Sequence, residues 1–147
     1  MEKIYINTDG GSRGNPGPAG IGVVFSNAGE EVFHSYKYYI GIGTNNEAEY
    51  QAIICALDIL LRSKWFAENN IAEKQVICRL DSQLVVEQIN GNYKVKQEHL
   101  KKFIGEIREK ISQMHLNISF VHIPREENKL ADKLVNEALD EKMKKTI

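Results

Sequence analysis

Four acidic residues lie at the boundaries of different predicted elements, and their oxygen atoms could together hold a metal ion. Asp9 and Asp81 each end a stretch of alternating apolar and polar residues, Glu49 lies at the start of a long apolar helix, and Asp132 lies in the last predicted helix. Carboxylates at the ends of neighbouring strands can converge on one point, and their mutual repulsion then needs a cation to offset it. An oxygen-only cluster favours Mg²⁺ or Mn²⁺ over zinc. The pattern therefore indicates a metal-dependent phosphoryl-transfer site.

Each carboxylate alone also has an ordinary explanation. Asp9 precedes two glycines and fits a turn, and Asp81 precedes a serine and fits a helix cap. Glu49 and Asp132 fit solvated helix positions, where most acidic residues are found. The occurrence of all four in different elements favours the shared site over these separate explanations.

The elements that would position these acids follow from the hydrophobic periodicity. Strands are predicted at residues 3–9, 21–26, 31–40, 75–80 and 116–123, and helices at 44–66, 82–89, 97–114 and from about 127 onwards. Thr44 and Glu47 fit a capping box for the first helix. The Gly- and Pro-rich stretch 10–20 is predicted to lack regular structure, and the tail from about 141 is expected to be frayed.

The order of these elements, β-β-β-α-β-α-α-β-α, predicts an α/β fold. Short turns between the first three strands indicate an antiparallel meander. The later strands are linked through helices and must be parallel neighbours of the first, which gives a mixed sheet flanked by helices. A chain of 147 residues with 42% hydrophobic content forms one domain, residues 1–147, with a proper core.

Composition excludes some classes of protein. The formal net charge of -1 excludes a polycationic nucleic-acid wrapper, so any nucleic-acid binding must come from a local surface and from bound metal. Cys55 and Cys78 lie in apolar runs, which favours free thiols in a reducing cytoplasm. The sequence has no signal-like N-terminus and no apolar run of membrane-spanning length. We therefore expect a cytoplasmic protein without a membrane partner.

The acids lie in motifs that together resemble type 1 ribonuclease H. The motifs are Asp9-Gly10-Gly11-Ser12, Gly14-Asn15-Pro16-Gly17-Pro18, Thr44-Asn45-Asn46-Glu47-Ala48-Glu49, Asp81-Ser82-Gln83 and Asn128-x-x-x-Asp132. They occur in order over nearly the whole chain. The resemblance implies a ribonuclease H-like fold with a five-stranded mixed sheet. It also implies an endonuclease that hydrolyses the RNA strand of an RNA–DNA hybrid and leaves 5′-phosphate and 3′-hydroxyl ends.

By the same resemblance, Asp9, Glu49, Asp81 and Asp132 would bind two Mg²⁺ ions, or Mn²⁺. Two such ions can make a water nucleophilic and stabilise the leaving oxyanion. We expect Asp9 between the two ions, because it leaves the central strand. Glu49 and Asp81 would then hold the ion nearer the leaving oxygen, and Asp132 the ion that activates water.

A second set of residues matches family positions for substrate contact. The expected contacts are Gly10, Gly11, Asn15, Thr44, Asn45, Asn46, Gln83, Arg125 and Asn128. Glycines let backbone groups approach the RNA closely, and side-chain amides suit 2′-hydroxyls and base edges. Thr44 and Asn15 also match a contact to a phosphate of the DNA strand. Alternatively, the glycines only fix turn geometry and Thr44 only caps its helix.

The chain departs from many family members in two places. The connection 121–128 is short and lacks a Gly-His-x-Gly loop, as in archaeal and some bacterial members. Arg125 is the better candidate there for a cation near the scissile phosphate, although a guanidinium cannot act as a base. No basic protrusion follows the short helix 82–89, so we expect weaker and more salt-sensitive hybrid binding.

Two other functions stay open at this point. One is a broader nuclease that also cuts double-stranded RNA. The other is a non-catalytic nucleic-acid-binding domain on the same fold, although none of the four carboxylates has been lost. A monomer is expected in either case.

Overall fold

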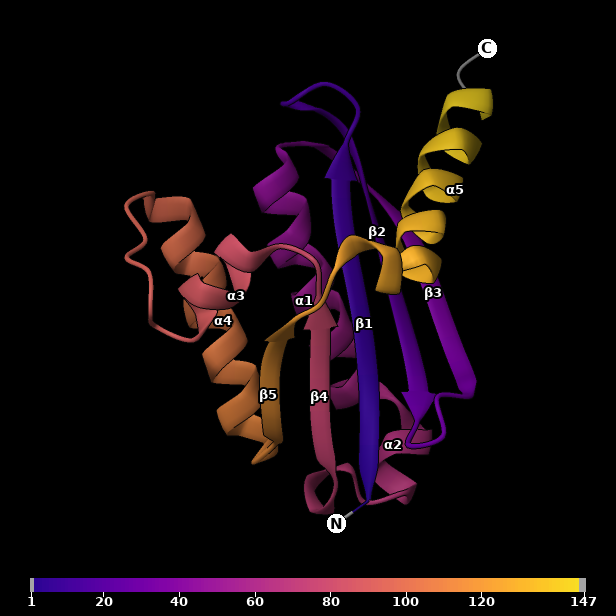
Figure 1. The fold of residues 1–147 in the computed structure, drawn as a ribbon, viewed down its shortest axis with the longest axis vertical. Coiled ribbons are helices and arrows are strands. Elements are labelled where there is room, and N and C mark those ends of the chain that lie inside the picture. Colours follow the sequence, from indigo (N-terminus) through magenta and orange to yellow (C-terminus); the bar gives the residue numbers. More distant parts are fainter. Residues whose placement is uncertain (1, 146–147) are drawn as a thin grey trace.

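Five strands form one mixed sheet in the computed structural model, which describes residues 2–145. The strands are β1 (Lys3–Ser12), β2 (Gly17–Asn27), β3 (Val32–Gly43), β4 (Gln75–Leu80) and β5 (Asn117–His122), in the spatial order β3-β2-β1-β4-β5. The pairs β1–β2 and β2–β3 are antiparallel, whereas β4 is parallel to both β1 and β5 (Figure 1). The predicted mixed sheet is confirmed.

Helices cover both faces of this sheet. They are α1 (Asn45–Arg62), α2 (Lys64–Glu68), α3 (Gln83–Ile89), α4 (Glu98–Met114) and α5 (Lys129–Lys145), with 3₁₀ turns η1 (Ile71–Glu73) and η2 (Arg125–Glu127). Helix α1 packs on one face with α4 beside it, and α5 packs on the other face over β2 and β3 (Figure 1). No helix within residues 2–145 is both long and apolar enough to cross a membrane.

Helix α1 begins as predicted and ends earlier than predicted. The Thr44 side chain accepts a hydrogen bond from the backbone of Glu47, whose side chain accepts one from the backbone N–H of Thr44, so the capping box is confirmed. The predicted end near Phe66 is wrong because Ser63 is extended (ψ 123°). The Ser63 hydroxyl caps the separate helix α2 instead.

Strands β1 and β2 reach further into the Gly-rich stretch than predicted. Gly10 and Gly11 pair with Ile21 and Gly20 in an antiparallel ladder, so only the tip of this stretch is irregular. A Cβ added at Gly10 would overlap the carbonyl group of Ala48 in α1. The missing side chain therefore lets the backbone of α1 lie directly against β1.

Helix α5 rests on β2 in a similar way. A Cβ added at Gly22 would overlap the backbone carbonyl of Ala131, one residue before Asp132. The helix begins at Lys129 rather than near residue 127, because residues 125–127 form the 3₁₀ turn. It then continues through Lys145, and the fraying expected from about residue 141 stays a prediction. Residues 146–147 of that tail lie outside the described part of the chain.

Candidate active site

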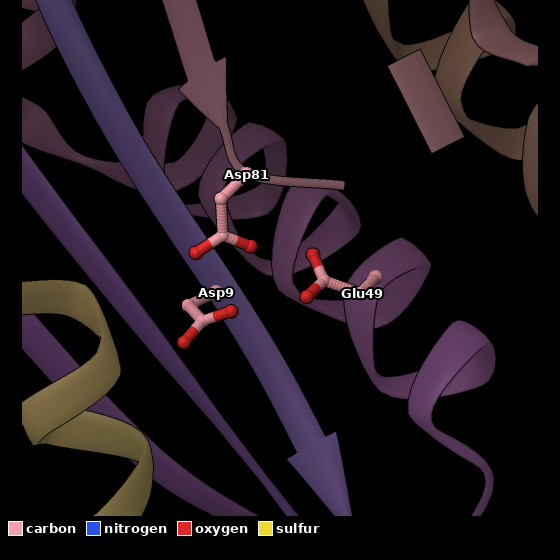
Figure 2. Close-up of side chains that lie close together, drawn as sticks. All are labelled: Asp9, Glu49 and Asp81. Atoms are coloured by element: carbon pink, nitrogen blue, oxygen red, sulfur yellow. The ribbon is translucent and has the colours of Figure 1, made fainter. Parts of the chain in front are cut away.

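Three of the four predicted acids converge at the carboxyl end of β4. Asp9 lies on β1 opposite Gly22 of β2, Asp81 directly follows the last residue of β4, and Glu49 lies on α1. One oxygen from each carboxylate lies within 4.8 Å of the others. Figure 2 shows the three side chains pointing toward one another from three different elements. The expected convergence of Asp9, Glu49 and Asp81 is therefore found in the structure.

Burial and repulsion from neighbouring acids make the carboxyl groups of Asp9 and Glu49 hard to ionise. Asp9 and Glu49 are both buried, each with 7% of its surface exposed. Burial, together with the negative charges of Asp81 and Asp132, raises the pKa of Asp9 from 3.8 to about 7. Burial and the neighbouring Asp9 hold the pKa of Glu49 well above its ordinary value. Such an arrangement disfavours negative charge unless a cation is present.

The cluster fits a divalent cation. The Oε2 atom of Glu49 is buried and has no hydrogen-bond partner among the described residues. Burying a polar oxygen without a partner costs roughly 1–3 kcal/mol, and a metal ion would remove that cost. The donors are all carboxylate oxygens, which hard ions such as Mg²⁺ and Mn²⁺ prefer.

Asp132 lies at the edge of the same site rather than inside the three-acid group. It lines a cavity of about 480 Å³ together with the other three acids. Its side chain is 37% exposed, and its Oδ1 lies 3.9 Å from Nη2 of Arg125. Arg125 itself is 81% exposed at the rim. The structure thus brings all four acids to one cavity, with Asp132 on the solvent side.

Asn128 is buried beside the acids and holds protein groups. Only 1% of the surface of Asn128 is exposed. Its Nδ2 donates to the carbonyl oxygen of Thr8 at 2.9 Å and to Oδ2 of Asp81 at 3.4 Å. Its Oδ1 accepts from Nδ2 of Asn7 at 3.1 Å. The amide of Asn128 thus contacts Asp81 and other protein groups, and the expected substrate contact at Asn128 stays a prediction.

The other predicted substrate residues divide between two cavities. Gly10, Gly11, Asn45 and Arg125 line the acidic cavity. A second cavity of about 560 Å³ is lined by Asn15, Thr44, Asn45, Asn46, Glu47, Gln97 and His99. Gln83 is exposed at the start of α3 and is absent from the described residues that line either cavity.

Hydrogen bonds join the Gly-rich segment to the start of α1. The backbone N–H of Asn45 donates to Oδ1 of Asn15 at 3.0 Å. The Oδ1 of Asn45 accepts from the backbone N–H of Ser12 at 2.9 Å. These contacts fix the two cavities relative to each other, because Asn45 lines both.

Some residues that line the acidic cavity were not predicted from the sequence. Arg13 reaches from the Gly-rich segment to α5, where its Nη2 lies 2.7 Å from Oδ1 of Asp140. Asn136, one helical turn after Asp132, also lines the cavity. Two features of the sequence could have indicated them: Arg13 directly follows the Asp9 motif, and Asn136 lies four residues after Asp132.

A larger cavity of about 610 Å³ lies between β3 and α1 but carries different chemistry. Its walls include Tyr36, Tyr38 and Cys55, and burial raises the pKa of the Cys55 thiol to about 11. Asp58 is the one carboxylate among the described residues that line it, and Lys110 neutralises Asp58 at 2.8 Å. Charge and donor type therefore distinguish the smaller acidic cavity as the candidate active site.

Comparison with known proteins agrees with this geometry. Residues 7–138 match a family model described as reverse transcriptase-like. The bifunctional protein Rv2228c of Mycobacterium tuberculosis is 40% identical over 139 residues, which is 94% of this chain and 36% of that protein. Ribonuclease HI of Halobacterium salinarum is 35% identical, over 95% of this chain and 65% of that protein. This chain therefore spans about a third of the first relative and about two thirds of the second.

A solved structure is more similar over its full length. LC11-RNase H1, isolated from compost, is 46% identical with a TM-score of 0.88, and the match covers 97% of this chain and 99% of that one. The same protein has been solved in complex with an RNA/DNA hybrid, where the match is 45% identical with a TM-score of 0.87 over 95% and 99% of the two chains. Both sequence and fold thus agree with these relatives across the elements that carry the acids.

Proposed function

This chain belongs to the type 1 ribonuclease H family, and from that premise we propose that it is an endonuclease that hydrolyses the RNA strand of RNA–DNA hybrids. The observation that carries the proposal is the convergence of Asp9, Glu49 and Asp81, with Asp132 on the same cavity. The hybrid bound by LC11-RNase H1 supports the choice of substrate.

We propose that the four acids hold two divalent ions, Mg²⁺ or Mn²⁺. Asp9, on the middle strand β1, would contact both ions, Glu49 and Asp81 one of them, and Asp132 the other. Bound divalent ions lower the pKa of water and neutralise charge on a phosphodiester. The protein contributes position, because Asp9 on β1, Glu49 on α1 and Asp81 at the end of β4 point toward one another (Figure 2).

The substrate contacts in this proposal follow the two cavities. The exposed guanidinium of Arg125 would bind a phosphate near the acids, since its planar fork matches phosphate oxygens. The backbone at Gly10 and Gly11 would lie against the RNA strand. Asn15 and Thr44 would bind a phosphate of the DNA strand in the second cavity.

The products would carry 5′-phosphate and 3′-hydroxyl ends. We also infer that residues 1–147 act as one domain and as a monomer in the cytoplasm. Two free cysteines, Cys55 and Cys78, support a reducing location.

Cleavage of labelled duplexes tests the proposal. RNA–DNA, RNA–RNA and DNA–DNA duplexes of one sequence are incubated with Mg²⁺, Mn²⁺ or chelator, using the unaltered protein, Asp9→Asn and Asp58→Asn. Asp58→Asn is the matched control, because it makes the same chemical change outside the acidic cavity. We expect metal-dependent cutting of the hybrid's RNA strand, lost only in Asp9→Asn.

Other results would assign a different function. Equal cutting of RNA–RNA would keep the site and broaden the substrate to double-stranded RNA. Hybrid binding without cutting in either metal would refute the nuclease proposal and indicate a binding domain.

A further inference from the structure

A hydrogen-bond chain crosses the sheet face beside the active site and ends on one of its carboxylates. Its members, in order, are Glu30, Arg79, Asn7, Asn128 and Asp81. Arg79 lies on β4 in register with Asn7 of β1, so the two side chains share one face of the sheet. This face is opposite the one that packs on α1, because Ile6 and Cys78 of the alternate positions are in the core under that helix.

The groups at the two ends of this hydrogen-bond chain fix the direction of its hydrogen bonds. Arg79 can only donate, and its Nε donates to Oδ1 of Asn7 at 2.8 Å. The Nδ2 of Asn7 must then face Asn128, whose Oδ1 accepts it at 3.1 Å. At the other end the carbonyl of Thr8 can only accept, and it receives Nδ2 of Asn128. The same Nδ2 lies toward Oδ2 of Asp81.

Arg79 is itself held firmly. Its Nη1 lies 2.6 Å from Oε1 of Glu30, in the turn between β2 and β3. Its guanidinium carbon lies 4.2 Å from the centre of the Tyr5 ring, and only 21% of its side chain is exposed. A guanidinium that stacks on a ring and pairs with a carboxylate keeps one orientation, so its Nε–H always points at Asn7.

We propose that Arg79 and Asn7 are positioning residues, which orient the amide of Asn128 so that it holds Asp81 for metal binding. The inference rests on the proposed function, because it assigns a metal to Asp81. If Arg79 is lost, Asn7 is free to rotate its amide and present oxygen to Asn128. The side-chain N–H groups of Asn128 can then donate to Asn7 instead of to Thr8 and Asp81.

The alternative is that Arg79 and Glu30 form an ordinary surface ion pair that only stabilises the sheet. The direction in which Arg79→Met changes the affinity for a cation distinguishes this alternative from a positioning role. Arg79→Met removes a positive charge near the carboxylates. Charge alone would then make cation binding tighter, because less positive potential opposes the ion. Loss of the oriented amide makes it weaker, because hydrogen bonds to metal-binding carboxylates support affinity.

Calorimetric titration of the metal-free protein with Mn²⁺ measures this effect without any cleavage assay. Loss of a hydrogen-bond partner of a metal ligand typically lowers metal affinity by about 10–100-fold. Arg79 is two hydrogen bonds away from such a partner, Asn128, so we expect Arg79→Met to weaken Mn²⁺ binding about fivefold. Arg79→Lys keeps a donor-only cation and should bind Mn²⁺ within about twofold of the unaltered protein. Unchanged or tighter binding by Arg79→Met would overturn the inference.

Lys74→Met is the matched control. Lys74 pairs with Glu2 at 2.6 Å at the other end of β4, so the variant also loses a cation and an ion pair of the sheet. We expect its Mn²⁺ affinity to stay unchanged. An equal loss in Lys74→Met would show a general effect of charge or stability and would refute a positioning role for Arg79.

The side-chain amide of Asn128 gives a readout that does not depend on metal. Its two N–H signals are assigned in a ¹⁵N-resolved NMR spectrum by their disappearance in Asn128→Asp. We expect these signals to move in Arg79→Met and to stay in place in Lys74→Met. If the Asn128 signals stay in place in both variants, the positioning role of Arg79 is refuted, even if the protein binds Mn²⁺ and cuts hybrids. If the unaltered protein binds no Mn²⁺, the proposed function fails, and the NMR result still decides the orientation.

Discussion

Replacement of Asp9 by asparagine should stabilise the metal-free protein while it abolishes hydrolysis. The pKa of Asp9 is raised from 3.8 to about 7, chiefly by burial. A raised pKa means that the fold favours the protonated acid. Its contribution to stability is therefore fully present below pH 3.8 and is lost as the pH rises through about 7. Asparagine has no charge to bury at any of these pH values.

The size of the effect follows from the same two pKa values. Each pKa unit corresponds to about 1.4 kcal/mol, so ionised Asp9 costs the folded state up to about 4 kcal/mol at pH 8. At pH 5 much of this cost is absent, because Asp9 is mostly protonated in the folded protein. The advantage of Asp9→Asn in free energy of unfolding should therefore grow by about 2.5 kcal/mol between pH 5 and pH 8.

Urea unfolding followed by circular dichroism, in chelator at both pH values, measures this difference. Added Mg²⁺ should then narrow the difference between the two proteins at pH 8. At about one hundred times its dissociation constant, it stabilises the unaltered protein by about 2.7 kcal/mol, whereas Asp9→Asn gains little.

Glu68→Gln controls for loss of an acid, because Glu68 is exposed at the end of α2 and is absent from the lining of the acidic cavity. A gain in Asp9→Asn that is the same at pH 5 and pH 8 would refute the reasoning. So would an equal response of Asp9→Asn and the unaltered protein to Mg²⁺.

Three further predictions concern the elements around the site. Gly10→Ala adds a Cβ that overlaps the Ala48 carbonyl, so α1 must shift; we expect hydrolysis to fall at least about tenfold and stability by about 1–3 kcal/mol, and unchanged kcat would contradict this. Tyr50→Phe removes the hydroxyl that donates to Oε1 of Gln88 at 2.5 Å, which should cost about 1–2 kcal/mol in urea unfolding and leave hydrolysis intact. Mn²⁺ affinity should rise from pH 6 to pH 8, because Asp9 with a pKa of about 7 must lose its proton to bind; equal calorimetric affinities would refute this.

Sequence patterns predicted the parts of this fold that depend on local periodicity. Alternation at residues 75–80 gave β4 with its bounds, and the Thr44–Glu47 capping box marked the start of α1. Asp9 and Asp81 could be placed together because strands connected through a helix lie parallel and end at the same edge.

The errors arose where packing, rather than local preference, decides the structure. The stretch after Asp9 was predicted to be irregular because glycine is rare in strands, yet Gly10 and Gly11 both pair with β2, and Gly10 lets the backbone of α1 approach. The end of α1 at Ser63 had no Gly or Pro to mark it.

The contacts of Asn128 inside the protein could not be predicted from the sequence for a related reason. Its partners are Asn7, Thr8 and Asp81, which come from two other elements. No spacing in the sequence reveals that its amide is buried between them. Contacts of this kind become visible only when the sheet order is known.

The use of β1 and of the segment around α5 to build the cavity has a consequence for protein synthesis. Asp9 lies on the first strand, whereas Asn128 and Asp132 come from just before and within α5, which is synthesised after all five strands. Until residues 128–132 have been synthesised, a nascent chain carries Asp9, Glu49 and Asp81 but has neither the Asn128 amide beside Asp81 nor a fourth carboxylate. Gly22, which α5 covers in the finished protein, is then open to water. We therefore expect the four-acid cavity to be complete only after α5 has been synthesised and has docked on β2.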